Sequence, residues 1–148
     1  MLTSMENRLT TIPDGMLPAE RNSEYASVLR EQVRLAVKEH KTSEAEALEH
    51  KLEALAASSR DQKVESIYES ARGYVMHANG DYANAVDELT SDLHSPLVVA
   101  QLIATEQKLN NADGTEKARV RLKYLRTPTA EWLVVTKMNG EGSQSAAN

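Results

Sequence analysis

Residues 68–96 read YESARGYVMHANGDYANAVDELTSDLHSP, and their spacing predicts two helices folded back on each other. Gly73 removes a side chain from the middle of the first helix, which costs about 1 kcal/mol relative to alanine and indicates that another backbone approaches there. Gly80 suits a left-handed C-terminal cap, and Asp81 suits the N-cap of the helix that follows. This stretch therefore predicts a helical hairpin whose two arms pack closely.

The second arm of the hairpin repeats the small-residue feature, and a new helix starts directly after it. Ala85 is the small residue of that arm, while Pro96 stands where the first turn of a third helix has no need of its backbone N–H. These residues define an architecture. They do not identify a partner or a pathway.

Apolar residues at helical spacing predict further helices on both sides of the hairpin. Three pairs indicate capping boxes at helix starts: Ser43 with Glu46, Ser59 with Gln62, and Asp113 with Glu116. The expected helices and their inward residues are 23–40 (Tyr25, Val28, Leu29, Val33, Ala36), a second from Ser43 (Ala45, Leu48, Leu52, Leu55), a third after Ser59 (Val64, Ile67, Tyr68, Ala71, Val75, Ala78), a fourth over 81–94 (Tyr82, Ala85, Leu89, Leu93), a fifth from Pro96 (Val99, Leu102, Ile103, Leu109) and a sixth from Asp113 (Ala118, Leu122, Leu125).

The two ends of the chain differ from this helical part. We expect residues 1–22 to be a flexible lead-in and residues 139–148 to be a disordered tail, which leaves 23–138 as one helical domain. Thr127-Pro128 begins a last segment, 128–138, whose start predicts a helix that covers the final hairpin. The apolar run around Trp132 also has strand propensity, so helix and strand both stay open for it.

Composition limits the fold and the function. With 148 residues the chain is long enough for one domain, and the absence of Phe together with a single Trp predicts helices packed through Leu, Ala and Val. A formal charge of −5 without a basic stripe argues against a nucleic-acid surface. The absence of Cys excludes disulfides, thiolate metal sites and cysteine nucleophiles. We find no signal peptide or membrane span, and expect a soluble protein, cytoplasmic by default.

The hairpin has weaker copies along the chain. Residues 80–85 match 113–118 at an offset of 33, and 41–45 form a third copy 40 residues upstream of Ala85. A period near 34, with a small residue in mid-helix, a Gly-Asp-Tyr turn and a terminal proline, resembles the tetratricopeptide repeat (TPR). The best unit covers 64–96. In the next unit, Glu106 stands where the inner small residue is expected, and the first pair of helices, 23–59, fits loosely.

The resemblance implies an all-α, right-handed superhelical array of about three antiparallel hairpins with a C-terminal covering helix. The residues that would pack the repeats are Gly73, Gly80, Tyr82, Ala85, Pro96 and Ala118. The alternative is a plain antiparallel bundle, in which Ala and Gly allow close packing around one core. The two differ in their contacts, since an array packs each hairpin on its neighbours and a bundle closes on itself.

The resemblance also implies a concave groove for a peptide or protein partner. Its positions in this chain are Ser70, Tyr74, His77, Ile103, Gln107, Asn110 and Asn111. Asn and Gln side chains both donate and accept hydrogen bonds, which suits an extended peptide backbone; a solvated helix surface is the alternative. Members that hold a terminal carboxylate use Lys, Arg and Asn here, and Ser70, Tyr74 and Ala78 do not support that activity.

We find no pattern that predicts catalysis, a metal or a cofactor. The four histidines are dispersed, and Glu46 with His50 is better explained as a solvated ion pair than as a metal site. Exposed cations at Arg119, Arg121, Lys123 and Arg126 indicate a solvated helix face, with a basic docking patch as the alternative. We therefore expect a noncatalytic protein-interaction module. A self-associating helical bundle, or an accessory domain of a larger enzyme, stays open.

Overall fold

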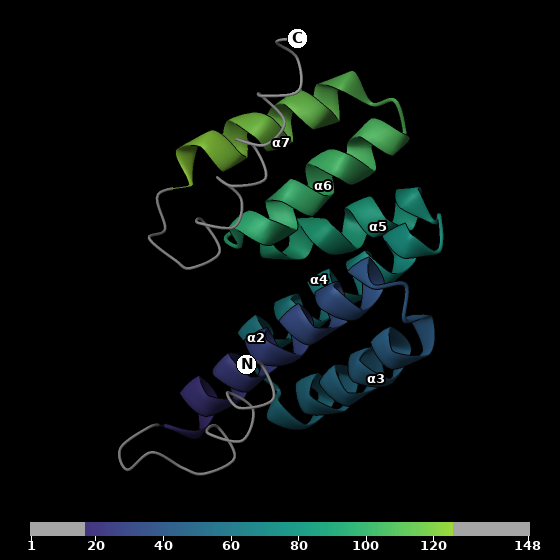
Figure 1. The fold of residues 1–148 in the computed structure, drawn as a ribbon. Helices are drawn as coiled ribbons and strands as arrows, with labels where there is room; N and C mark the ends of the chain where they lie inside the picture. The colour runs from purple at the N-terminus through teal and green to yellow at the C-terminus, as the bar shows by residue number, and fades with distance from the viewer. Residues whose placement is uncertain (1–16, 126–148) are drawn as a thin grey trace, which may run out of the picture.

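The computed structural model describes residues 17–125, which form helices joined by short turns, and no strand occurs among them (Figure 1). The prediction of an all-α fold is confirmed. The elements are α2 (Pro18–Lys38), α3 (Thr42–Ser59), α4 (Gln62–Ala78), α5 (Tyr82–Leu89), a 3₁₀ turn η1 (Thr90–Asp92), α6 (Pro96–Lys108) and α7 (Ala112–Tyr124).

The helices pack in the order of the chain. Successive pairs form three hairpins, α2 with α3, α4 with α5, and α6 with α7, and α4 also contacts both helices of the first hairpin. α6 contacts α5, η1 and, narrowly, α4, while α7 contacts only α6 among the described elements. In Figure 1 α7 lies at the top of the molecule and α3 at the bottom. Within residues 17–125, therefore, the backbone of the first hairpin does not come close to that of the last.

The turn between the two arms of each hairpin is built in the same way. One residue has a positive φ in each turn: His40 at 58°, Gly80 at 83° and Asn110 at 55°. Each donates its N–H to the carbonyl three residues earlier, and the next residue donates to the carbonyl five residues before itself. This is the Schellman motif, which satisfies the last carbonyls of a helix. The prediction of Gly80 as a left-handed cap is confirmed.

The three turns give the spacing of the hairpins. Their positive-φ residues are 40 and then 30 residues apart. Five residues beyond each lie Ala45, Ala85 and Thr115, all buried where the second arm meets the first. The sequence alignment of 41–45 with the copy at Ala85 therefore agrees with the structure. The alignment of Ala85 with Ala118 is wrong by three residues, although Ala118 is itself buried.

Three expected helix starts are wrong, and in two of them another residue supplies the cap. α4 is capped by Asp61, whose carboxylate accepts from Lys63 N at 2.8 Å, while Ser59 is the last residue of α3. α7 is capped by Asn111, which accepts from Gly114 N at 3.1 Å. The third, Ser43, lies inside α3, whose N-cap Lys41 makes no side-chain cap bond.

Two helix boundaries differ from expectation as well. α2 begins at Pro18, five residues before the expected start at 23, because proline at the first helical position has the φ that a helix needs. The fourth helix, expected over 81–94, ends at Leu89 and continues as η1. Asp81 is its N-cap residue as predicted, but its carboxylate accepts from the side chain of Asn84 at 2.8 Å and makes no cap bond.

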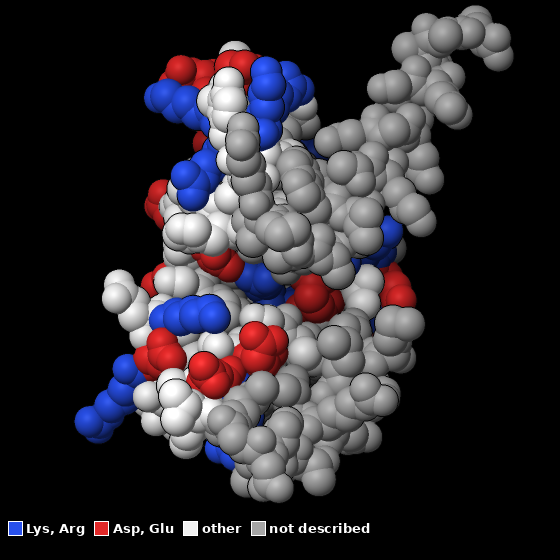
Figure 2. Space-filling view, turned by 90° about the vertical axis from the view of Figure 1, so that its left-hand side faces the viewer, with Lys and Arg blue, Asp and Glu red and all other residues white. Residues whose placement is uncertain are grey.

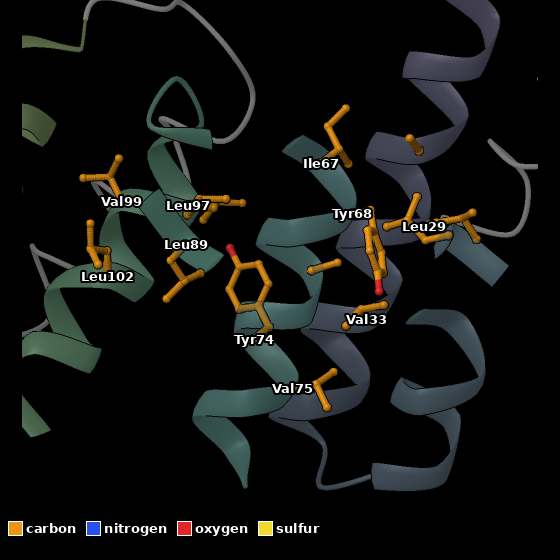
Figure 3. Packing of buried hydrophobic residues seen from close by; sticks show 14 of the residues in the cluster. Leu29, Val33, Ile67, Tyr68, Tyr74, Val75, Leu89, Leu97, Val99 and Leu102 are labelled. Atoms are coloured by element: carbon orange, nitrogen blue, oxygen red, sulfur yellow. The ribbon is translucent and has the colours of Figure 1, made fainter. Parts of the chain in front are cut away.

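The core follows α4, which is buried on several sides. Tyr68 points toward α2, where Leu29 and Val33 lie, whereas Tyr74 lies on the other side beside Leu89 (Figure 3). Gly73 sits against Leu89, because a Cβ at this glycine would come within 2.7 Å of Leu89 Cγ. The close approach that the sequence predicts at Gly73 is therefore present between α4 and α5.

Most of the expected inward residues are buried or partly buried, and two are exposed. Ala78 and Leu109 are exposed, because each lies at the C-terminal end of its helix, beside the turn. The expectations for residues 1–16, for the covering segment 128–138 and for the tail 139–148 lie outside the described residues. Within 17–125, no helix combines the length and the apolar character that crossing a membrane requires.

Candidate functional site: a cleft between α2, α4 and α6

A cleft of about 340 Å³ lies where the first arms of the three hairpins come together. Its volume is at the lower end of the range of ligand pockets, roughly 300–1,000 Å³. We call it the first-arm cleft; its lining residues are Arg34, Val37 and Lys38 of α2, Tyr74 and His77 of α4, and Leu97, Ala100, Gln101 and Ala104 of α6. The α6 residues recur at three- and four-residue steps, which places them on one face of the helix.

The lining of the first-arm cleft combines an apolar floor with a polar edge. Tyr74 is only 1% exposed, and its ring lies beside Leu89 and Leu97 (Figure 3). The polar edge includes Arg34, which donates from Nε to Glu31 Oε2 at 2.8 Å, and the exposed Lys38. Such a lining can accept an apolar side chain and, beside it, hydrogen-bonding or acidic groups.

His77 contacts both α5 and α6 from its place on α4. Its Nδ1 lies 2.9 Å from Thr105 Oγ1 on α6, and its ring meets the edge of Tyr82 on α5 with centroids 5.2 Å apart. The Thr105 hydroxyl donates to the carbonyl of Gln101 at 2.8 Å, so its oxygen accepts from Nδ1–H. The neutral ring with its proton on Nδ1 fits this arrangement.

The surroundings of His77 predict that acid weakens the fold. Burial, with a smaller contribution from the charge of Lys108, lowers the pKa of His77 below its ordinary value. As the pH falls, His77 therefore takes up a proton in the unfolded chain before it does so in the folded one. The contribution of neutral His77 to folding stability is complete above the unfolded pKa of about 6.5 and is lost as the pH falls through the lower folded pKa. We expect His77→Gln to reduce the pH dependence of urea unfolding between about pH 5 and 7.

A second histidine provides the control for this prediction. His50 has a side chain that is 75% exposed, and its Nδ1 lies 3.3 Å from Glu53 Oε2 on the surface of α3. His50→Gln makes the same substitution at this exposed position, so a difference between the two variants can be assigned to His77. Equal pH profiles of unfolding for the wild type and His77→Gln would contradict the assignment of acid sensitivity to His77.

The groove residues that the sequence predicts do not all lie in one place in the structure. Tyr74 and His77 line the first-arm cleft, with Tyr74 as its floor. Ser70 is fully buried and donates to the carbonyl of Ile67 at 2.8 Å, so the expectation that it faces a ligand is wrong. Ile103 is partly buried and packs against the core.

The remaining predicted groove residues lie in a different place. Gln107, Asn110 and Asn111 are exposed and line a separate hollow of about 500 Å³ at the α6–α7 turn. Asn110 supplies the left-handed cap there, while Asn111 caps α7 and donates from Nδ2 to Glu106 Oε2 at 2.8 Å. Both asparagines have a structural task in the turn.

The turn spacing explains which cleft residues the sequence reasoning missed. Counting back 40 residues from Tyr74 and His77 reaches Arg34 and Val37, and counting forward 30 from Tyr74 reaches Ala104. All three line the first-arm cleft. An offset of 33 between hairpins selects the wrong turn of α6. The offsets of 40 and 30 between the turn residues lead to these three lining residues.

A larger hollow of about 610 Å³ lies between α2, η1 and the N-terminal ends of α4 and α6. Its most ordered feature is an ion pair, Arg30 Nη1 to Asp92 Oδ2 at 2.5 Å. Arg30 is 3% exposed, so this pair joins the first hairpin to the turn after α5 in a poorly hydrated place. Its geometry indicates a role in packing.

The charged groups elsewhere do not assemble a reactive site. Within residues 17–125, no three potential His, Asp or Glu ligands lie close enough together to hold a metal ion. His50 pairs with Glu53, so the expected Glu46–His50 pair is wrong. On the face in Figure 2, Lys and Arg lie beside Asp and Glu over the described part of the surface.

The comparisons with known proteins add no relative. No protein-family model matches the chain, and no curated protein or solved structure is similar enough to indicate one. The case for a function therefore depends on the geometry of the described residues.

Proposed function

We propose that the protein is a noncatalytic interaction module whose three hairpins form a TPR-like right-handed array, and that the first-arm cleft binds an extended segment of a partner protein. The observation that carries the proposal is the cleft itself, because each of the three hairpins contributes its first arm to the lining. The order of packing supports the array, since each hairpin contacts its neighbour and the backbone of α2 does not come close to that of α6 or α7.

The chemistry of the cleft supports a peptide as the ligand. Ala100 and Ala104 leave room along α6, and the neighbouring Gln101 has an amide that can both donate and accept hydrogen bonds. Val37 and Leu97 offer an apolar surface for a side chain. An extended peptide presents the same combination, alternating side chains and unpaired backbone amides.

A blocked cleft tests the proposal. Ala104→Arg places a long side chain in the cleft, and Ala83→Arg places the same side chain on the exposed surface of α5. Peptides selected from a random displayed library against the wild type should bind Ala83→Arg with unchanged affinity. Because the arginine occupies their site, we expect Ala104→Arg to weaken binding at least tenfold, which is about 1.4 kcal/mol, measured by fluorescence anisotropy.

The same experiment can contradict the proposal. Circular dichroism should show that both variants keep the helical content of the wild type. If the selected peptides bind Ala104→Arg as tightly as Ala83→Arg, or if selection enriches no binding peptide, the cleft is not the site.

A further inference from the structure

α7 presents an outward face that no other described element covers. It contacts only α6 among the described elements, and its exposed side includes Val120 and Tyr124, which are 46% and 66% exposed. Lys123 Nζ lies 5.7 Å from the Tyr124 ring centroid. Two large apolar side chains one turn apart are thus exposed together, as they often are on interaction surfaces.

The surroundings of these apolar residues are basic. Between Ala112 and Tyr124 the chain has four cations and two carboxylates, a net charge of +2 in a protein whose net charge is −5. Lys117 pairs with Asp113 at 2.6 Å, and Arg121 donates to the carbonyl of Leu93 at 3.1 Å. Arg119 and Lys123 are the other two exposed cations of this face.

The opposite end of the molecule has the complementary character. α3 contains four glutamates and one lysine, a net charge of −3 over Thr42–Ser59. Its exposed residues include Ala47 and Ala54, which lie seven residues, or about two helical turns, apart, with Glu46 and Glu53 one position before each. Small side chains allow another helix to approach, and the adjacent carboxylates can meet cations on that helix.

We propose that the α7 face docks on the α3 face of a second copy of this chain, so that molecules join head to tail. A second copy is the occupant because the complementary surface is on the same chain, and because α7 and α3 lie at opposite ends of the described part (Figure 1). The two faces of one molecule therefore cannot meet each other. A heterologous contact of this kind repeats and forms an open series of molecules.

The association depends on apolar contact and on charge, and each has its own consequence. Val120 and Tyr124 supply the contact area, so Val120→Asp with Tyr124→Asp abolishes association. Arg119 and Lys123 face the carboxylates of α3, so salt weakens it, since exposed charges are screened over about 10 Å at 0.1 M. This proposal is independent of peptide binding in the first-arm cleft.

Sedimentation velocity over a wide concentration range tests the head-to-tail contact. The wild type at low salt should exceed the monomer mass of 16.3 kDa, without stopping at a dimer as the concentration rises. We expect Arg119→Glu with Lys123→Glu to be monomeric, and Glu46→Lys with Glu53→Lys likewise. An equimolar mixture of these two variants should associate again, because each restores the opposite charge for the other.

A matched charge change and a folding measurement complete the experiment. Glu65→Lys with Asp87→Lys alters exposed residues of α4 and α5, away from both faces, and should associate as the wild type does. Circular dichroism shows whether each variant folds. A wild type that stays monomeric at every concentration, a closed dimer, or a mixture of the two charge variants that stays monomeric would overturn the proposal.

Discussion

Gly73→Val should destabilise the protein by about 3 kcal/mol, the upper part of the range for overpacking a core. A Cβ at this position would lie 2.7 Å from Leu89 Cγ and 3.2 Å from Leu89 N, so the clash involves the backbone of α5 as well as a side chain. Leu89 is fully buried and cannot swing into solvent. Urea unfolding followed by circular dichroism measures the loss of stability.

A compensating substitution separates this clash from a general intolerance of α4. Leu89→Ala alone should cost about 2–5 kcal/mol, because it leaves a cavity. Gly73→Ala adds a methyl group directed at that space and also improves helix propensity by about 1 kcal/mol. The double variant Gly73→Ala with Leu89→Ala should therefore be more stable than the sum of the two single effects. Strict additivity would show that the two positions do not touch.

Asp92→Ala should destabilise the protein by about 3 kcal/mol, since removing one partner of a buried ion pair costs about 3–5 kcal/mol and this carboxylate is partly hydrated. The carboxylate of Asp92 is 16% exposed, whereas the side chain of Arg30 is 4% exposed. The arginine loses a charged partner in a place where water replaces it poorly. Urea unfolding at pH 7 gives the change in free energy.

The double variant Arg30→Met with Asp92→Ala is the control for this pair. Methionine keeps much of the volume of the arginine stem and has no charge to bury, so the double variant should be more stable than Asp92→Ala alone. If Asp92→Ala instead unfolds within about 0.5 kcal/mol of the wild type, as an ordinary surface substitution does, the ion pair has no part in joining α2 to η1.

The sequence predicted the helical hairpins well because the relevant residues act locally. Gly80 adopts a left-handed conformation that few other residues tolerate, and Gly73 has no side chain where Leu89 approaches. These properties belong to single residues and short spacings. The same is true of Pro96, whose missing N–H fits the first turn of α6.

The cleft was harder to predict because it depends on the alignment between hairpins. In two of the three hairpin turns the residue with positive φ, His40 or Asn110, is not a glycine. The sequence therefore gives little indication that these turns match the one at Gly80. A three-residue error in the alignment moves a prediction by almost one helical turn. This error puts Gln107 in the place of Ala104 beside Tyr74 and His77, and so moves the predicted groove to the α6–α7 turn.

The helix starts were mispredicted for a different reason. Ser59 and Asp113 satisfy the capping-box pattern, but the true caps, Asp61 and Asn111, lie two residues away and lack the Glu or Gln three residues later. Only the hydrogen bonds to Lys63 N and Gly114 N distinguish the true caps. Residues that favour N-caps are thus weaker predictors of a helix start than a glycine is of a turn that needs a positive φ.

Photo-crosslinking in the cells that make the protein tests the central claim most directly. A photoreactive phenylalanine derivative at position 104 faces the first-arm cleft, and the same group at position 83 faces solvent on α5. Our account predicts a crosslink to a partner protein from position 104 that a selected peptide prevents, and no such crosslink from position 83. The same crosslinks from both positions, or none from position 104, would contradict it.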